Sequence, residues 1–171
     1  MVQTGGPAEA ITAMVGGKIH AAALSPPATL QARKLKLKEL LDMSKLEAEY
    51  HINGVVTTRK FLRAQEDIAR RFLKAYIEGA ARGQKDKNFA LKVMGKYFRT
   101  DDKEILEESY DTTIKSNFSL PPYPSIPGIA SLLQGLEKQN PRAKGAKPEE
   151  FADSRLVREL DQSGFVKAAL Q

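Results

Sequence analysis

The first 27 residues place glycine and proline where a chain must turn, and this limits what the N-terminal region can fold into. Gly5-Gly6-Pro7 predicts the start of a helix, and Gly16-Gly17 predicts its end. The apolar run over residues 19–24 predicts a short strand covered on both faces, stopped by Ser25-Pro26-Pro27. A helix followed by such a strand is typical of the second half of a β-α-β unit. We therefore expect the chain to correspond to the later part of a larger α/β protein.

The predicted secondary structure changes near residue 58. Before it, we expect short strands and helices to alternate, ending in a β-branched strand at residues 55–58 after the Asn53-Gly54 turn. Beyond it, apolar residues recur at helical spacing between proline-rich connections, as in a helix over about 66–82 with Ile68, Phe72 and Ile77 on one face. The second part should therefore be helical.

Composition excludes several classes of function. The net charge is +6, but acidic residues are mixed with basic ones along the chain, so we expect no nucleic-acid surface. The absence of cysteine excludes disulfides, thiolate metal sites and a cysteine nucleophile in these 171 residues. No apolar run is long enough for a transmembrane helix, and no signal peptide follows Met1. As written, the chain would stay in the cytoplasm.

A series of short motifs in the second part resembles a known family in order and spacing. The motifs are Phe72-Leu-Lys-Ala-Tyr-Ile-Glu-Gly79, Ala90-Leu-Lys-Val-Met-Gly-Lys-Tyr97, Leu106-Glu-Glu-Ser-Tyr110, Tyr123-Pro-Ser125, Gly128-Ile129, Asn140-Pro-Arg-Ala-Lys144, Lys147-Pro-Glu-Glu-Phe151 and Leu160-Asp-Gln-Ser-Gly-Phe165. Together with the opening stretch, they resemble the C-terminal portion of periplasmic substrate-binding proteins of ABC importers, of the nitrate/sulfonate/taurine type. One departure is His20, where that family usually has aspartate. The resemblance covers essentially the whole chain.

The resemblance implies a fold and a function. It implies part of the two-lobed periplasmic-binding-protein fold of type II, an α/β fold with a helix-rich C-terminal part. Residues 1–52 would then be the later part of lobe two, 53–58 a hinge-crossing strand, and 59–171 the helical end of lobe one. The implied function is binding of a small anionic or zwitterionic solute between the lobes, followed by docking on a membrane permease. Family members are periplasmic, and we expect the full-length protein to be a monomer.

Candidate ligand-binding residues follow from the opening stretch. Gly5, Gly6 and Pro7 expose backbone N–H groups at a helix N-terminus, which suits a carboxylate, sulfonate or phosphate, although the same residues also make an ordinary tight turn. Ser25 and Pro26 follow the predicted strand and could orient a ligand, but they could equally serve only to end the strand.

Two further candidates lie at the predicted hinge. His51 and Asn53 enter the crossing segment, and a polar loop tip is the alternative interpretation. His20 lies within the predicted apolar strand and is expected to be a hydrogen-bonded core residue rather than a ligand or base. Neither histidine has a partner at metal-ligand spacing, so we expect no metal site and no cofactor. No residues form an evident acid–base pair, and we predict no catalytic residue.

Two other hypotheses remain open. The thiamine-pyrimidine synthases are enzymes with a related fold, but they carry a cysteine-rich motif, which this chain lacks. The third hypothesis is a small helical interaction module with the N-terminal region as an addition. We expect a solute-binding protein and not an enzyme.

Overall fold

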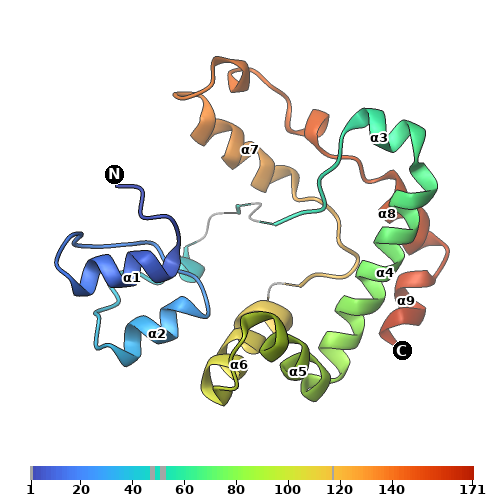
Figure 1. Cartoon of the computed structure of the whole chain (residues 1–171). Coiled ribbons are helices and arrows are strands. Elements are labelled where there is room, and N and C mark those ends of the chain that lie inside the picture. The colour runs from blue at the N-terminus through green and yellow to red at the C-terminus, as the bar shows by residue number, and fades with distance from the viewer. Residues whose placement is uncertain (1, 47–48, 51–52, 117) are drawn as a thin grey trace. The chain divides into compact units, whose positions relative to one another are not determined.

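The structure is a computed structural model of the chain, and it describes residues 2–46, 49–50, 53–116 and 118–171. All regular elements in these residues are helical (Figure 1). In chain order they are α1 (Pro7–Val15), α2 (Ala28–Lys34), η1 (Met43–Lys45), α3 (Arg59–Ala64), α4 (Glu66–Lys85), α5 (Lys87–Phe98), α6 (Lys103–Ser109), η2 (Tyr110–Lys115), α7 (Ile126–Leu136), η3 (Pro141–Ala143), η4 (Pro148–Phe151), α8 (Arg155–Gln162) and α9 (Phe165–Leu170).

The predicted α/β fold class is wrong for the residues that the structure describes. Residues 19–24 and 53–58 are not helical, but they form no strand, and most of their side chains are exposed. Val56, for example, is 91% exposed. Sequence preference for a strand reflects packing on a pleated surface, and a strand also needs a neighbouring backbone to pair with. The described part of the chain offers these two segments no such neighbour, so their apolar and β-branched residues remain outside any sheet.

The chain divides into two compact units. Unit 1 comprises Met1–Ser44 and Asp86–Asn117, and unit 2 comprises Lys45–Lys85 and Phe118–Gln171. The backbone therefore passes from unit 1 to unit 2 near residue 45, returns after α4, and passes to unit 2 again near residue 118. Each unit is built from segments far apart in the sequence.

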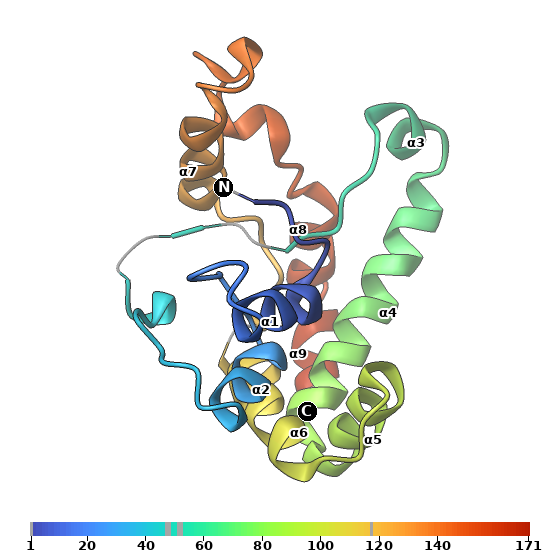
Figure 2. The same cartoon turned by 60° about the vertical axis from the view of Figure 1, so that its left-hand side comes forward.

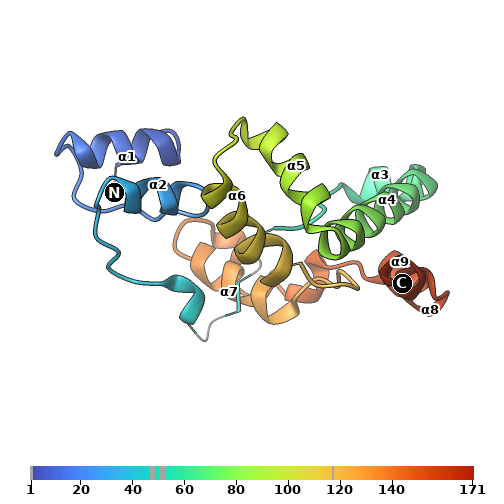
Figure 3. The same ribbon diagram turned by 90° about the horizontal axis from the view of Figure 1, so that it is seen from below.

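Unit 1 contains two separate apolar clusters. The first joins α1 and α2, which lie side by side (Figure 3), through Ile11, Ala28 and Ala32. We call this helix pair, together with the two glycines before α1 (residues 5–34), the N-terminal arm. The second cluster joins α5, α6 and η2 through Ala90, Met94, Leu106 and Tyr110. The two clusters have no residue in common.

Aspartates begin two helices of unit 1. Asp86 accepts a hydrogen bond from the N–H of Phe89 at the start of α5. Asp102 Oδ1 accepts from the N–H groups of Glu104 and Ile105 at the start of α6. These bonds satisfy donors that the first turn leaves without a partner, and the negative charge suits the helix dipole.

Unit 2 is organised around α4, the longest helix. Figure 2 shows α4 beside α8 and α9, and Ile77, Leu160 and Val166 form the buried cluster between them. Ile77 is fully buried, whereas Ile68 and Phe72, predicted on the same inward face, are 43% and 54% exposed. The inner face of α4 is therefore narrower than the spacing of its apolar residues suggests.

Local signals also fix the ends of several other helices of unit 2. Ser125 Oγ accepts a hydrogen bond from the N–H of Gly128 and caps α7. Asn140 caps η3 in the same way. Gly164 has a φ of +80°, which favours glycine, and it separates α8 from α9. No helix of the described chain has the length and apolar character needed to cross a membrane.

Candidate functional site

The candidate residues Gly5, Gly6 and Pro7 form the N-terminus of α1, as the sequence predicts. Gly5 has a φ of +99°, Gly6 occupies the N-cap position, and Pro7 is the first helical residue. No side chain caps this end of the helix. The backbone N–H groups of the first turn and the positive end of the helix dipole are therefore oriented toward this terminus.

The carboxylate of Glu9 lies over the same two glycines. A Cβ atom added to Gly6 would stand 2.8 Å from Glu9 Oε2, and one added to Gly5 would stand 3.8 Å from Glu9 Cγ. Glu9 is the third residue of the helix, where an acidic side chain can fold back toward the N-terminus. The α1 N-terminus thus already has an anionic group of its own, and an anionic ligand would compete with Glu9.

Ser25 and Pro26 lie at the start of α2 in the same unit. The Ser25 carbonyl accepts a hydrogen bond from the N–H of Ala28 at 2.9 Å, which forms the turn into the helix. The Ser25 side chain is exposed. The structure therefore places all five of these predicted residues on the N-terminal arm, at the starts of α1 and α2.

Of the two residues predicted at the hinge, His51 and Asn53, the structure describes only one. His51 lies outside the described residues. Asn53 belongs to unit 2, where its side chain is exposed. His20, expected within a strand, is exposed in the loop between α1 and α2.

A shallow depression adjoins Glu9 along the outer face of α1. Its volume is about 550 Å³, and it is lined by Ala8, Glu9, Thr12, Ala13, Gly16 and Lys18. The Thr12 hydroxyl donates to the carbonyl of Ala8 at 3.0 Å and so is already satisfied. The depression therefore offers one acidic and one basic side chain on an otherwise small and apolar floor.

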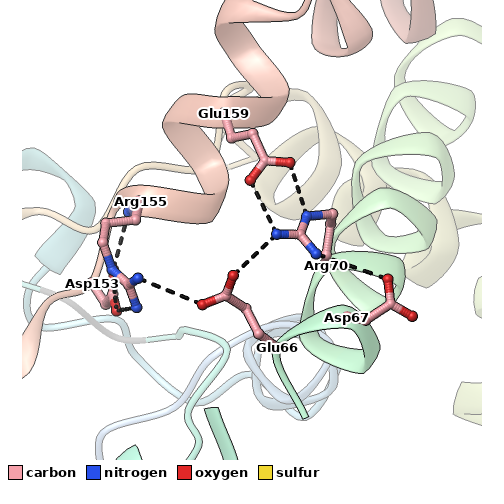
Figure 4. Close-up of polar contacts among 6 residues, drawn as sticks. All are labelled: Glu66, Asp67, Arg70, Asp153, Arg155 and Glu159. Carbon is pink, nitrogen blue, oxygen red and sulfur yellow. Dashed lines mark hydrogen bonds and ion pairs between the residues drawn. The ribbon is translucent and has the colours of Figure 1, made fainter. Parts of the chain in front are cut away.

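Sequence reasoning missed a dense group of charges in unit 2. This α4–α8 charge cluster consists of Glu66, Asp67, Arg70, Asp153, Arg155 and Glu159 (Figure 4). Arg70 Nε donates to Glu159 Oε1 at 2.8 Å, and Arg70 Nη2 donates to Glu66 Oε1 at 3.1 Å. The hydrogen bond to Glu159 is the main reason that the pKa of Arg70 is raised.

The second half of the cluster extends the same network. Arg155 pairs with Asp153 at 2.8 Å and with Glu66 at 3.5 Å, so Glu66 joins the two arginines. The hydrogen bonds from Arg155 lower the pKa of Asp153. Each charge in the cluster has a partner of opposite sign, and the pairs Arg70–Glu159 and Arg155–Glu66 join α8 to α4. The spacing of Glu66 and Arg70 predicts their pairing, but only the fold brings Glu159 to them.

Tyrosine positions from the motif series have structural contacts. The Tyr123 hydroxyl donates to Asp161 Oδ2 at 2.9 Å, and this bond raises the pKa of Tyr123. Tyr110 is buried in unit 1, and the ammonium group of Lys87 lies 5.3 Å from the centre of its ring.

Within the described residues, no three histidine, aspartate or glutamate side chains lie in an arrangement that could hold a metal ion. The chain was compared with protein-family models, with curated proteins and with solved structures, and none of them matches it.

Proposed function

We propose that the chain acts in solute capture for an ABC importer, as part of a solute-binding component for a small anionic or zwitterionic molecule of the sulfonate, nitrate or taurine kind. The observation that carries the proposal is the ordered series of motifs from residue 72 to residue 165. These motifs lie beyond residue 58, in the part of the chain that the sequence predicts to be helical. The absence of strands at residues 19–24 and 53–58 therefore does not affect them.

Several of these motif residues have structural tasks in unit 2, and this supports the proposal. Tyr123 and Asp161 belong to different motifs and are joined by a hydrogen bond. Ser125 caps α7, Asn140 caps η3, and Gly164 supplies the positive φ between α8 and α9. Residues that fix helix ends and helix contacts are what two chains with the same helical scaffold would have in common.

The α1 N-terminus is where we expect the anionic group of the solute to bind. Its backbone N–H groups and helix dipole favour negative charge. The Glu9 carboxylate occupies this position, and its own charge opposes a second anion. Replacing Glu9 with glutamine keeps the size of the side chain and removes this repulsion.

Isothermal titration of the full chain with taurine, nitrate and methanesulfonate tests the proposal. We expect saturable binding of at least one of them, and Glu9→Gln should tighten it about twofold to fivefold, the size of a single charge effect at a helix end. Glu78→Gln is the control, because Glu78 is an exposed glutamate of unit 2. Absence of binding to all three solutes would contradict the proposal. Equal changes in affinity from Glu9→Gln and Glu78→Gln would show that the solute does not bind at the α1 N-terminus.

One observation favours the helical interaction module as a second candidate. The outer face of α4 carries the exposed Ile68 and Phe72, and a Cβ added to Gly79 would meet nothing within 4 Å. A second helix could pack closely against such a face. A chain that binds none of the solutes, yet melts cooperatively as a monomer in sedimentation and calorimetry experiments, would favour this module.

A further inference from the structure

The N-terminal arm is connected to the rest of unit 1 by one helix contact. Among the described helices, α1 contacts only α2, and α2 contacts α6 in addition to α1. The apolar clusters of the arm and of α5, α6 and η2 are separate. No continuous apolar core therefore joins the arm to the remainder of its unit, and the contact between α2 and α6 determines where the arm lies.

Ion pairs line this contact. Lys34 Nζ lies 2.6 Å from Asp102 Oδ2 and 3.1 Å from Glu104 Oε2. Arg33 Nη1 lies 2.9 Å from both carboxylate oxygens of Glu108. The two cations are consecutive at the end of α2, and the three carboxylates all belong to α6 or its cap. The attraction between the helices is therefore concentrated in a few charges at the surface.

The two helices α2 and α6 each carry a buried side-chain oxygen without a hydrogen-bond partner among the described residues. Leu30 and Ile105 are buried, but Thr29 Oγ1 and Ser109 Oγ are also buried and have no hydrogen-bond partner among the described residues. Thr29 lies one turn before Arg33, and Ser109 directly follows Glu108 in sequence. A buried hydroxyl without a partner lowers the stability of the packed state, because water would satisfy it in the open state. These two helices therefore gain less from packing than their burial suggests.

We propose that the N-terminal arm undocks reversibly from α6 when salt screens the ion pairs of Arg33 and Lys34, while α5, α6 and η2 remain folded on their own apolar cluster. Salt weakens attraction between exposed charges but does not weaken apolar burial. The arm carries the candidate residues 5–7 and 25–26, so its docking also controls where they lie. The proposal does not depend on solute binding.

Hydrogen exchange measured by mass spectrometry on the full chain tests this directly. Between about 0.01 M and about 1 M sodium chloride, the Debye length shortens from roughly 30 Å to roughly 3 Å. We expect exchange in α1 and α2 to accelerate several-fold over this range, with exchange in α5 and α6 unchanged. Unchanged exchange in α1 and α2, or an equal acceleration in all four helices, would overturn the proposal.

A pair of variants separates the ion pairs from the helix caps. Asp102→Asn removes the charge that Lys34 contacts but keeps an oxygen to accept from Glu104 N and Ile105 N, so α6 retains its cap. Combined with Glu104→Gln and Glu108→Gln, it removes all three carboxylates of α6 and its cap that pair with Lys34 and Arg33, and it should give rapid exchange in the arm at low salt and no further response to salt. Glu107→Gln is the control, because Glu107 is exposed on the same helix and should leave the wild-type response intact. A wild-type salt response in the triple variant would contradict the proposal. If that variant fails to fold, the wild-type salt series decides.

Discussion

Replacing Ile77 with alanine should destabilise unit 2 much more than the same replacement at Ile68 on the same helix. Ile77 is fully buried in the cluster with Leu160 and Val166, whereas Ile68 is 43% exposed. The change removes three carbon atoms, worth about 0.8 kcal/mol each when fully buried. That gives about 2.4 kcal/mol, and the cavity left behind raises the expected loss at Ile77 to about 3 or 4 kcal/mol. At Ile68 the expected loss is below about 1.5 kcal/mol, because less surface leaves water.

The comparison is clean because both variants gain the same helix propensity from alanine, so this contribution cancels. Urea unfolding followed by circular dichroism gives the two free energies of unfolding. Hydrogen exchange locates the effect: α8 and α9 should lose protection in Ile77→Ala, and α5 and α6 should not, because they belong to unit 1. Equal losses from the two variants would refute the assignment of the inner face of α4 as the core of unit 2.

Three further outcomes follow from individual side chains. The pKa of Asp102 is lowered below its ordinary value of 3.8, first by the hydrogen bond from Lys34 and then by the one from the N–H of Ile105. The ionised Asp102 carboxylate therefore stabilises the folded state above pH 3.8, and this stabilisation is lost as the pH falls through the lowered pKa. Carboxyl NMR should record that low midpoint, and Lys34→Met should raise it. Gly79→Ala should stabilise the chain by up to about 1 kcal/mol, because Gly79 lies within α4 and the added methyl group meets nothing. Gly164→Ala should instead destabilise it by about 1 kcal/mol in urea unfolding, because its φ is +80°.

The helices were predictable because their signals are local. Asp102 and Ser125 begin helices through bonds to backbone groups only two or three residues away, and such signals are visible in the sequence. The predicted strands failed for the opposite reason. Residues 19–24 and 55–58 have the composition of strands, but a strand depends on a partner that local composition does not reveal.

In the candidate site, too, local features were predictable from the sequence and long-range contacts were not. The turn at Gly5, Gly6 and Pro7 and its helix were predictable, and Glu9 at the third helical position was a visible sign that an acidic side chain could reach back to it. The pairing of Arg70 with Glu159 was not predictable, because 89 positions separate the two residues. Contacts of that kind depend on how α8 packs against α4.

The short connection between α8 and α9 limits how this part of the chain can change in length. Only Ser163 and Gly164 separate the two helices, and both helices pack against α4. Each residue advances a helix by about 100°, so one inserted residue would turn Val166, now 2% exposed, away from Leu160. Insertions and deletions should therefore be rejected here and accepted in the exposed loop at residues 144–147, where Gly145 has open space around it.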